Sequence, residues 1–202
     1  MTRRLLGSNT ISGEYSTTSP NTSAVSASGS DVIVTDNGAL TISTTGDAGM
    51  GLSVSNGAKI TLDDSGSTIR TSGEGSHAIT IVGDNSEAML NNLTVSTEGE
   101  IASAVLFSSN AKGTIDGGSY TATGEGSYGV EILNGADLTI KNATITTSGY
   151  GMARAIVNRY ATLSLDNVNI NTTGDFGNAG IYNDGELTGS NVTITTTGSQ
   201  SF

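Results

Sequence analysis

A unit of about 25 residues recurs along most of this chain of 202 residues. Its clearest copy is Asn134 to Gly149, and edited copies end on glycines at steps of 24 to 27 residues. These glycines are Gly46, Gly73, Gly99, Gly124, Gly149, Gly174 and Gly198. A repeat of this length is typical of a solenoid, in which each unit stacks on the next. We therefore expect one repeat domain over residues 24–202, preceded over residues 1–23 by an irregular lead-in or a degraded first coil.

Each unit holds three short segments in which aliphatic and polar residues alternate, separated by Gly, Asn or Asp. The alternation predicts strands, because it places each aliphatic pair on one face. Ile145, Ile170 and Ile194 occupy equivalent positions in successive units, so we expect them in one vertical file. The sequence thus predicts an all-β parallel β-helix with three strands per coil and roughly seven coils. The coil around Lys112-Gly113 and Gly117-Gly118 has the fewest aliphatic residues, and we expect it to be the softest internal coil.

The composition narrows the classes of partner. The net charge is −11 and the isoelectric point is about 4.2, so a phosphate backbone would be repelled and we expect no nucleic-acid partner. The absence of cysteine excludes disulfides and thiolate metal sites. Residues 1–6 begin like the basic end of a signal peptide, but Gly7-Ser8-Asn9-Thr10 interrupts them. We therefore expect no export signal in this chain.

Asparagines recur seven residues before the repeat glycines. These are Asn92, Asn142, Asn167 and Asn191. Asparagine tolerates the left-handed backbone conformation, and its amide can bond the next amide of a stack. We interpret them as a structural turn ladder.

Two stretches carry a resemblance to a known family. Ile181 to Thr188, followed by Asn191 to Ile194, resembles the repeat of pertactin-like autotransporter passengers of Gram-negative bacteria, as does Asn134 to Ile140. The resemblance implies a right-handed β-helix that is exported by a type V route and is displayed at the outer membrane or released as an adhesin or virulence factor. It further implies an outer-membrane β-barrel translocator in the full-length protein. The function it predicts is a non-catalytic adhesive or structural rod that contacts a protein or glycan at a cell surface.

The repeat glycines are mostly followed by an acidic residue. The row comprises Asp47, Glu74, Glu100, Glu125 and Asp175. Stacking would place neighbouring carboxylates about 5 Å apart, a repulsion of under about 1 kcal/mol per pair in water. We interpret the row as a solvated edge, with a site for a cation or a basic partner as the alternative. The sequence indicates no cofactor and no metal site beyond this alternative.

Asp63-Asp64-Ser65-Gly66-Ser67 resembles the nucleophile motif of serine-protease autotransporters. The only histidine, His77, follows the serine, whereas the triad of that class requires histidine before it. We therefore interpret both as turn residues. A carbohydrate-active β-helix remains an alternative, but the short repeat steps leave no long loops and the eight basic residues do not cluster in the sequence. We expect no enzyme.

Outward hydroxyl residues on the third segment suggest a second alternative, an ice-binding solenoid. The pairs are Thr41/Ser43, Thr94/Ser96, Ser119/Thr121, Thr144/Thr146 and Thr193/Thr195, interrupted by Arg70, Asn169 and Asn171. Exposed threonine is also favoured simply by β-propensity. Finally, only Ser199 to Phe202 follow the last repeat glycine, so we expect end-to-end self-association or fraying there.

Overall fold

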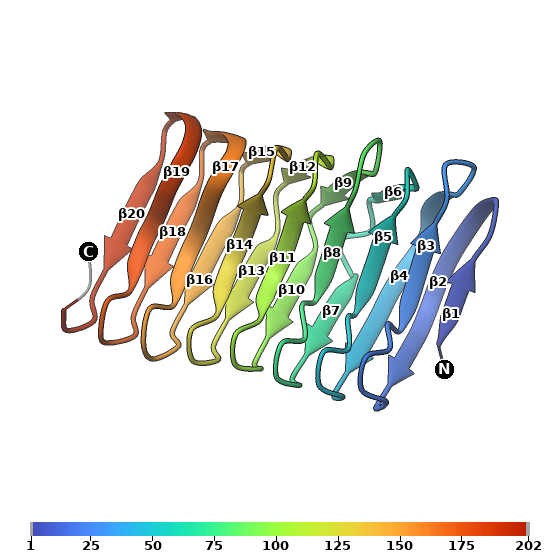
Figure 1. The fold of residues 1–202 in the computed structure, drawn as a ribbon, viewed down its shortest axis with the longest axis horizontal. Coiled ribbons are helices and arrows are strands. Elements are labelled where there is room, and N and C mark those ends of the chain that lie inside the picture. The colour runs from blue at the N-terminus through green and yellow to red at the C-terminus, as the bar shows by residue number, and fades with distance from the viewer. Residues whose placement is uncertain (1, 201–202) are drawn as a thin grey trace.

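The computed structural model describes residues 2–200, and its regular elements there are all β-strands. Met1 and Ser201–Phe202, the outer ends of the two predicted ranges, lie outside the described residues. Figure 1 shows the strands side by side, from blue at the N-terminus to red at the C-terminus, with the two termini at opposite ends. The described residues contain no helix with the length and apolarity needed to cross a bilayer.

The strands form three faces, and four long strands turn from one face onto the next. The first face holds β1 (Arg3–Leu5), β3 (Val25–Ser28), β5 (Leu52–Ser55), β8 (Ile79–Val82), β11 (Ser103–Ser108) and β14 (Tyr128–Leu133). The second holds β6 (Lys59–Leu62), β9 (Glu87–Asn91), β12 (Lys112–Asp116) and β15 (Asp137–Lys141). The third holds β7 (Thr68–Thr71), β10 (Thr94–Thr97), β13 (Ser119–Ala122), β16 (Thr144–Thr147), β18 (Asn169–Thr172) and β20 (Thr193–Thr196). The long strands are β2 (Ser8–Thr17) and β4 (Ile33–Thr44), from the second face to the third, and β17 (Arg154–Asp166) and β19 (Ala179–Ser190), from the first to the second.

Equivalent strands of successive coils pair in parallel and in register. Ile145 pairs with Ile170, and Ile170 pairs with Ile194, so the predicted single file is confirmed. Inward residues of each face form such files, because strand alternation sends every second side chain to the interior. The predicted parallel β-solenoid of about 25 residues per coil is thus confirmed.

The number of coils is about eight, one more than the sequence predicted. The additional coil consists of β1 and β2, which pair with β3 and β4. Leu5, Ile11 and Tyr15 of this coil are buried in the common core. Within the described part of residues 1–23, β1 and β2 form a coil, which was one of the two alternatives. Its apolar residues are too widely spaced to show the alternation of the later units.

We number the coils 1 to 8 from the N-terminus. Coils 1 and 2 are β1–β2 and β3–β4, coils 3 to 6 are β5–β7, β8–β10, β11–β13 and β14–β16, and coils 7 and 8 are β17–β18 and β19–β20. The core runs as one cluster from Leu5 to Ile170. In coil 8 the equivalent positions are half-open, with Ile194 49% exposed, because the described residues place no further coil on that side.

The predicted asparagines lie at a corner between the second and third faces. Asn92, Asn142, Asn167 and Asn191 all have φ between 52° and 54°. Nδ2 of Asn167 donates to Oδ1 of Asn142 (2.9 Å), which is the amide-to-amide bond expected of a ladder. Gly117 (φ 76°) holds the equivalent position in coil 5, because glycine adopts the left-handed region freely. A second set of left-handed asparagines, Asn56, Asn85, Asn110 and Asn134, lies at the corner between the first and second faces.

Candidate functional site

The acidic residues predicted to form an edge lie at the corner between the third and first faces. The backbone N–H that follows each acid donates to the carbonyl of the residue at the same position one coil on. Ala48 does so to Glu74 (2.7 Å) and Gly75 to Glu100 (2.8 Å). Asp47, Glu74, Glu100, Glu125 and Asp175 therefore stack in one file, with Tyr150 between the last two. All five acidic side chains are exposed.

The two ends of this file bond to the backbone. Oδ1 of Asp47 accepts a hydrogen bond from the N–H of Glu74 (3.1 Å), and Oδ1 of Asp175 accepts one from the N–H of Ser199 (2.6 Å). The bonds from Ser199 lower the pKa of Asp175 below its ordinary value. In the part of the chain that the structure describes, no three His, Cys, Asp or Glu side chains converge closely enough to hold a metal ion.

Asp63 to Ser67 form the corner between β6 and β7. Oδ1 of Asp64 accepts the N–H of Gly66 (2.8 Å), and the buried Ser67 hydroxyl accepts the N–H of Leu40 (3.0 Å). His77 lies before β8 and its Nδ1 accepts the N–H of Ser103 (2.9 Å), while burial lowers its pKa. The serine motif and the histidine therefore serve different corners.

The hydroxyl residues of the third face lie in two parallel files. Thr94, Ser119 and Thr144 form one, and Ser96, Thr121 and Thr146 form the other, uninterrupted through coils 4 to 6. Arg70 interrupts the second file in coil 3, where it is paired with Glu98, and Asn169 and Asn171 interrupt the two files in coil 7, as predicted.

The second face carries a charged file that the sequence analysis did not identify. Lys112 lies in register between Glu87 and Asp137, and Nζ of Lys59 bonds Oε2 of Glu87 (2.8 Å). The alternating charges could have been found by comparing the first residue of the second strand in successive units. They were missed because each unit contributes only one of them.

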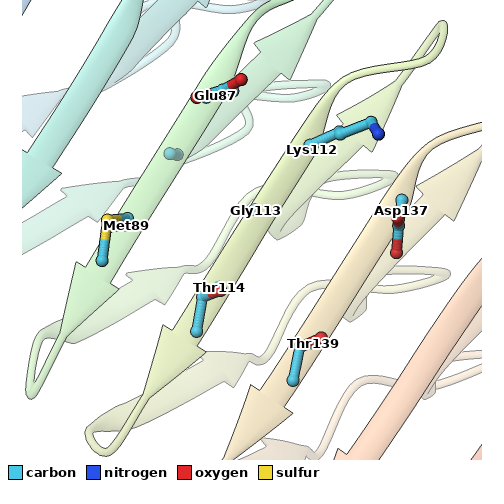
Figure 2. A pocket seen from close by; sticks show the side chains of 8 residues that line it. Glu87, Met89, Lys112, Gly113, Thr114, Asp137 and Thr139 are labelled. Atoms are coloured by element: carbon cyan, nitrogen blue, oxygen red, sulfur yellow. The ribbon is translucent and has the colours of Figure 1, made fainter.

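Beside this charged file lies a shallow groove. Figure 2 shows its outward side chains on three neighbouring strands, with Thr114 between Met89 and Thr139. Gly113 lies on its floor, and Met89 is exposed at one end. The groove thus offers alternating charges, two hydroxyl groups and one apolar side chain to a molecule lying across the coils.

The chain was compared with known proteins. No family model matches it, and no curated protein sequence matches it. Among solved structures, the A-module of mannuronan C-5 epimerase AlgE6 from Azotobacter vinelandii is similar over 89% of the chain, with 17% sequence identity and a TM-score of 0.28. The chain spans 60% of the length of that structure.

Proposed function

We propose that the chain is a stretch of an autotransporter passenger, a non-catalytic rod that is displayed at the surface of a Gram-negative bacterium or released from it. In this role it contacts a protein or glycan at a cell surface. The observation that supports the proposal is the parallel pairing of equivalent strands, which repeats the same three faces along one axis. A full-length protein of this kind would carry an outer-membrane β-barrel translocator.

This architecture suits contact with a long partner better than capture of a small molecule. Outward side chains recur once per coil, so a partner lying along the rod meets equivalent groups at intervals of about 4.8 Å. Several weak contacts along the rod together then raise the overall affinity for the partner, as in other solenoids with extended binding surfaces. The groove of Met89, Thr114 and Thr139 beside the charged file is the contact surface that we assign to this role.

Two measurements test the proposal. Antibody against the chain should label intact bacteria, and external protease should remove that label; labelling only after permeabilisation would contradict surface display. Purified chain should bind cells that the bacterium contacts. Thr114→Arg, which fills the groove, should reduce this binding, whereas Thr121→Arg on the third face should not.

Ice binding is the second candidate, because the hydroxyl files of coils 4 to 6 are in register on one face. The chain should then show thermal hysteresis that Thr121→Lys removes and Thr114→Lys leaves intact. Absence of hysteresis in the unmodified chain would eliminate this candidate. Cleavage of an acidic polysaccharide by the purified chain would instead contradict the non-catalytic role.

A further inference from the structure

Two arginines and a tyrosine meet on the first face, where coil 7 lies against coil 8. The guanidinium carbon of Arg154 lies 4.6 Å from the centroid of the Tyr182 ring, and that of Arg159 lies 5.3 Å from it. Both arginines belong to β17, and the register pairs Tyr182 of β19 with Val157, between them in the sequence. Val157 is fully buried although Glu131 and Tyr182, its register partners, are not. The neighbouring side chains therefore form a packed layer over the sheet.

Within residues 2–200, the guanidinium N–H groups of both arginines have no hydrogen-bond acceptor. A guanidinium that lies over a ring engages it with its face and keeps its in-plane N–H groups for other partners. Among the described residues, no ion pair or hydrogen bond engages either guanidinium, whereas Arg70 is paired with Glu98. Arg154 and Arg159 are half-buried, so their positions are restrained by packing. Such preorganised donor forks suit bidentate recognition of a carboxylate.

Two acidic side chains lie near this cluster, and neither occupies the donors. The carboxylate of Glu131 accepts a hydrogen bond from the Ser103 hydroxyl (2.7 Å). Asp184 is in register with Arg159 but is exposed and makes no ion pair with it. Burial raises the pKa of Glu131, and this effect is opposed by the hydrogen bond from Ser103 and by the charge of Arg159.

A hollow lies at the corner that directly follows Arg159, and its lining indicates the kind of molecule that would carry the anion. Tyr160 follows Arg159 directly and is 71% exposed, and the hollow beside it is lined in part by Asp184 and Glu186. An acidic peptide would bring further carboxylates against these two acids and be repelled. A sugar would instead offer hydroxyl donors to them and a ring face to Tyr160.

We propose that Arg154, Arg159 and Tyr182 form a binding site for the carboxylate of an acidic sugar, with the hollow beside Tyr160 receiving the hydroxyl groups of that sugar or its neighbour. The two arginines and Tyr182 lie on the first face, whereas the groove of the proposed function lies on the second. The ligand chemistry of the site does not depend on whether the chain is displayed at a cell surface. The net charge of −11 repels an anionic ligand at long range. At intermediate salt this repulsion is screened beyond about 8 Å, so it weakens binding at the two arginines less than the net charge alone would suggest.

The test is a calorimetric titration of the full chain with a galacturonate trisaccharide, with the neutral galactose trisaccharide and a triglutamate peptide as comparison probes. The galacturonate probe should bind, and the neutral sugar and the peptide should bind at least about tenfold more weakly. Arg154→Gln and Arg159→Gln should each weaken galacturonate binding by about tenfold or more, and the double variant should abolish it. Tyr182→Phe retains the ring and should bind normally, whereas Tyr182→Leu should bind less.

Arg70→Gln is the matched control, because it removes the same charge from the third face. It should leave galacturonate binding unchanged, and unfolding midpoints of all variants show whether each remains folded. The inference is overturned if the unmodified chain does not bind galacturonate, if the folded Arg154 and Arg159 variants bind it normally, or if the peptide binds as tightly. A negative titration together with normal cell binding refutes this site and leaves the proposed function standing, and the reverse pattern refutes the function and leaves the site.

Discussion

Coils 5 and 6 enclose the same stretch of core with different side chains. In the register of the stack, Phe107 of coil 5 faces Ile132 of coil 6, Gly113 faces Leu138, and Tyr120 faces Ile145. At these three positions coil 6 has aliphatic residues of similar size, whereas coil 5 combines two aromatic rings with a glycine. All the side chains in these positions are fully buried.

The difference shows that the interior of each coil is filled, although different residue types fill it. A Cβ atom added to Gly113 would lie 2.4 Å from Cε1 of Phe107, so the phenyl ring occupies the space that a side chain at position 113 would take. The prediction that coil 5 is the least stable internal coil rests on a count of aliphatic residues. That count does not include the aromatic residues Phe107 and Tyr120. This lower stability stays a prediction, and amide hydrogen exchange in coil 5 against coil 6 measures it directly.

The largest expected effect comes from Phe107→Ala. Removing the ring should lower the free energy of unfolding by about 3–5 kcal/mol, because Gly113 has no side chain to fill the cavity. Ile132→Ala in coil 6 is the matched variant and should cost less, since Leu138 remains beside it. Guanidinium unfolding of both variants checks the order, and an equal loss would mean that the two coils are packed alike.

A smaller loss is expected from Gly113→Leu, which introduces the residue of coil 6 into coil 5. Overpacking against Phe107 should cost about 1–3 kcal/mol. Combining it with Phe107→Ile recreates the pair found in coil 6 and should recover part of this loss. A double-mutant cycle by chemical unfolding should give a favourable coupling of about 1 kcal/mol or more. Additive losses would show that the two positions do not share space.

The corner between the second and third faces gives a third contrast, because Gly117 of coil 5 corresponds to Asn142 of coil 6. Asn142→Ala should destabilise by about 1–2 kcal/mol, since alanine is strained at φ 52° and the bonds to Asp116 and Asn167 are lost. Asn142→Gly should cost less, because glycine accepts the conformation. Thermal unfolding of the two variants tests this, and an equal cost would attribute the effect to the side-chain bonds alone.

The smallest effect is expected from Tyr120→Phe and has the opposite sign. The Tyr120 hydroxyl is buried and finds no hydrogen-bond partner among the described residues, so its removal should stabilise by about 1 kcal/mol. Burial, and then the charge of Asp116, raise the pKa of Tyr120 well above its ordinary value of 10.0. Above pH 10 the unfolded chain loses this proton while the folded chain keeps it, so stability should fall as pH rises. Unfolding midpoints from pH 8 to 11 should fall less steeply in Tyr120→Phe, and identical slopes would contradict the assignment.

The fold was predictable because two simple periods determine it. Alternation within a strand selects the inward residues, and the constant repeat length selects which of them stack, as Ile145, Ile170 and Ile194 show. The asparagine corner was predictable for a local reason, the tolerance of asparagine for positive φ. Coil 1 escaped a definite prediction because its buried residues do not repeat the spacing of the later units.

What the sequence determined by itself is thus the stack: parallel coils, an aliphatic interior and the files of outward residues. What only the tertiary structure decided is how residues of different strands share space, as Phe107 does with Gly113 within coil 5 and as Arg154 and Arg159 of coil 7 do with Tyr182 of coil 8. The physical reason is that the sequence period specifies whether a side chain points inward or outward. Which other side chains it contacts depends on the size and conformation of its neighbours in the stack. Residues 23 to 28 positions apart therefore become neighbours through the stack without leaving a local signal in the sequence.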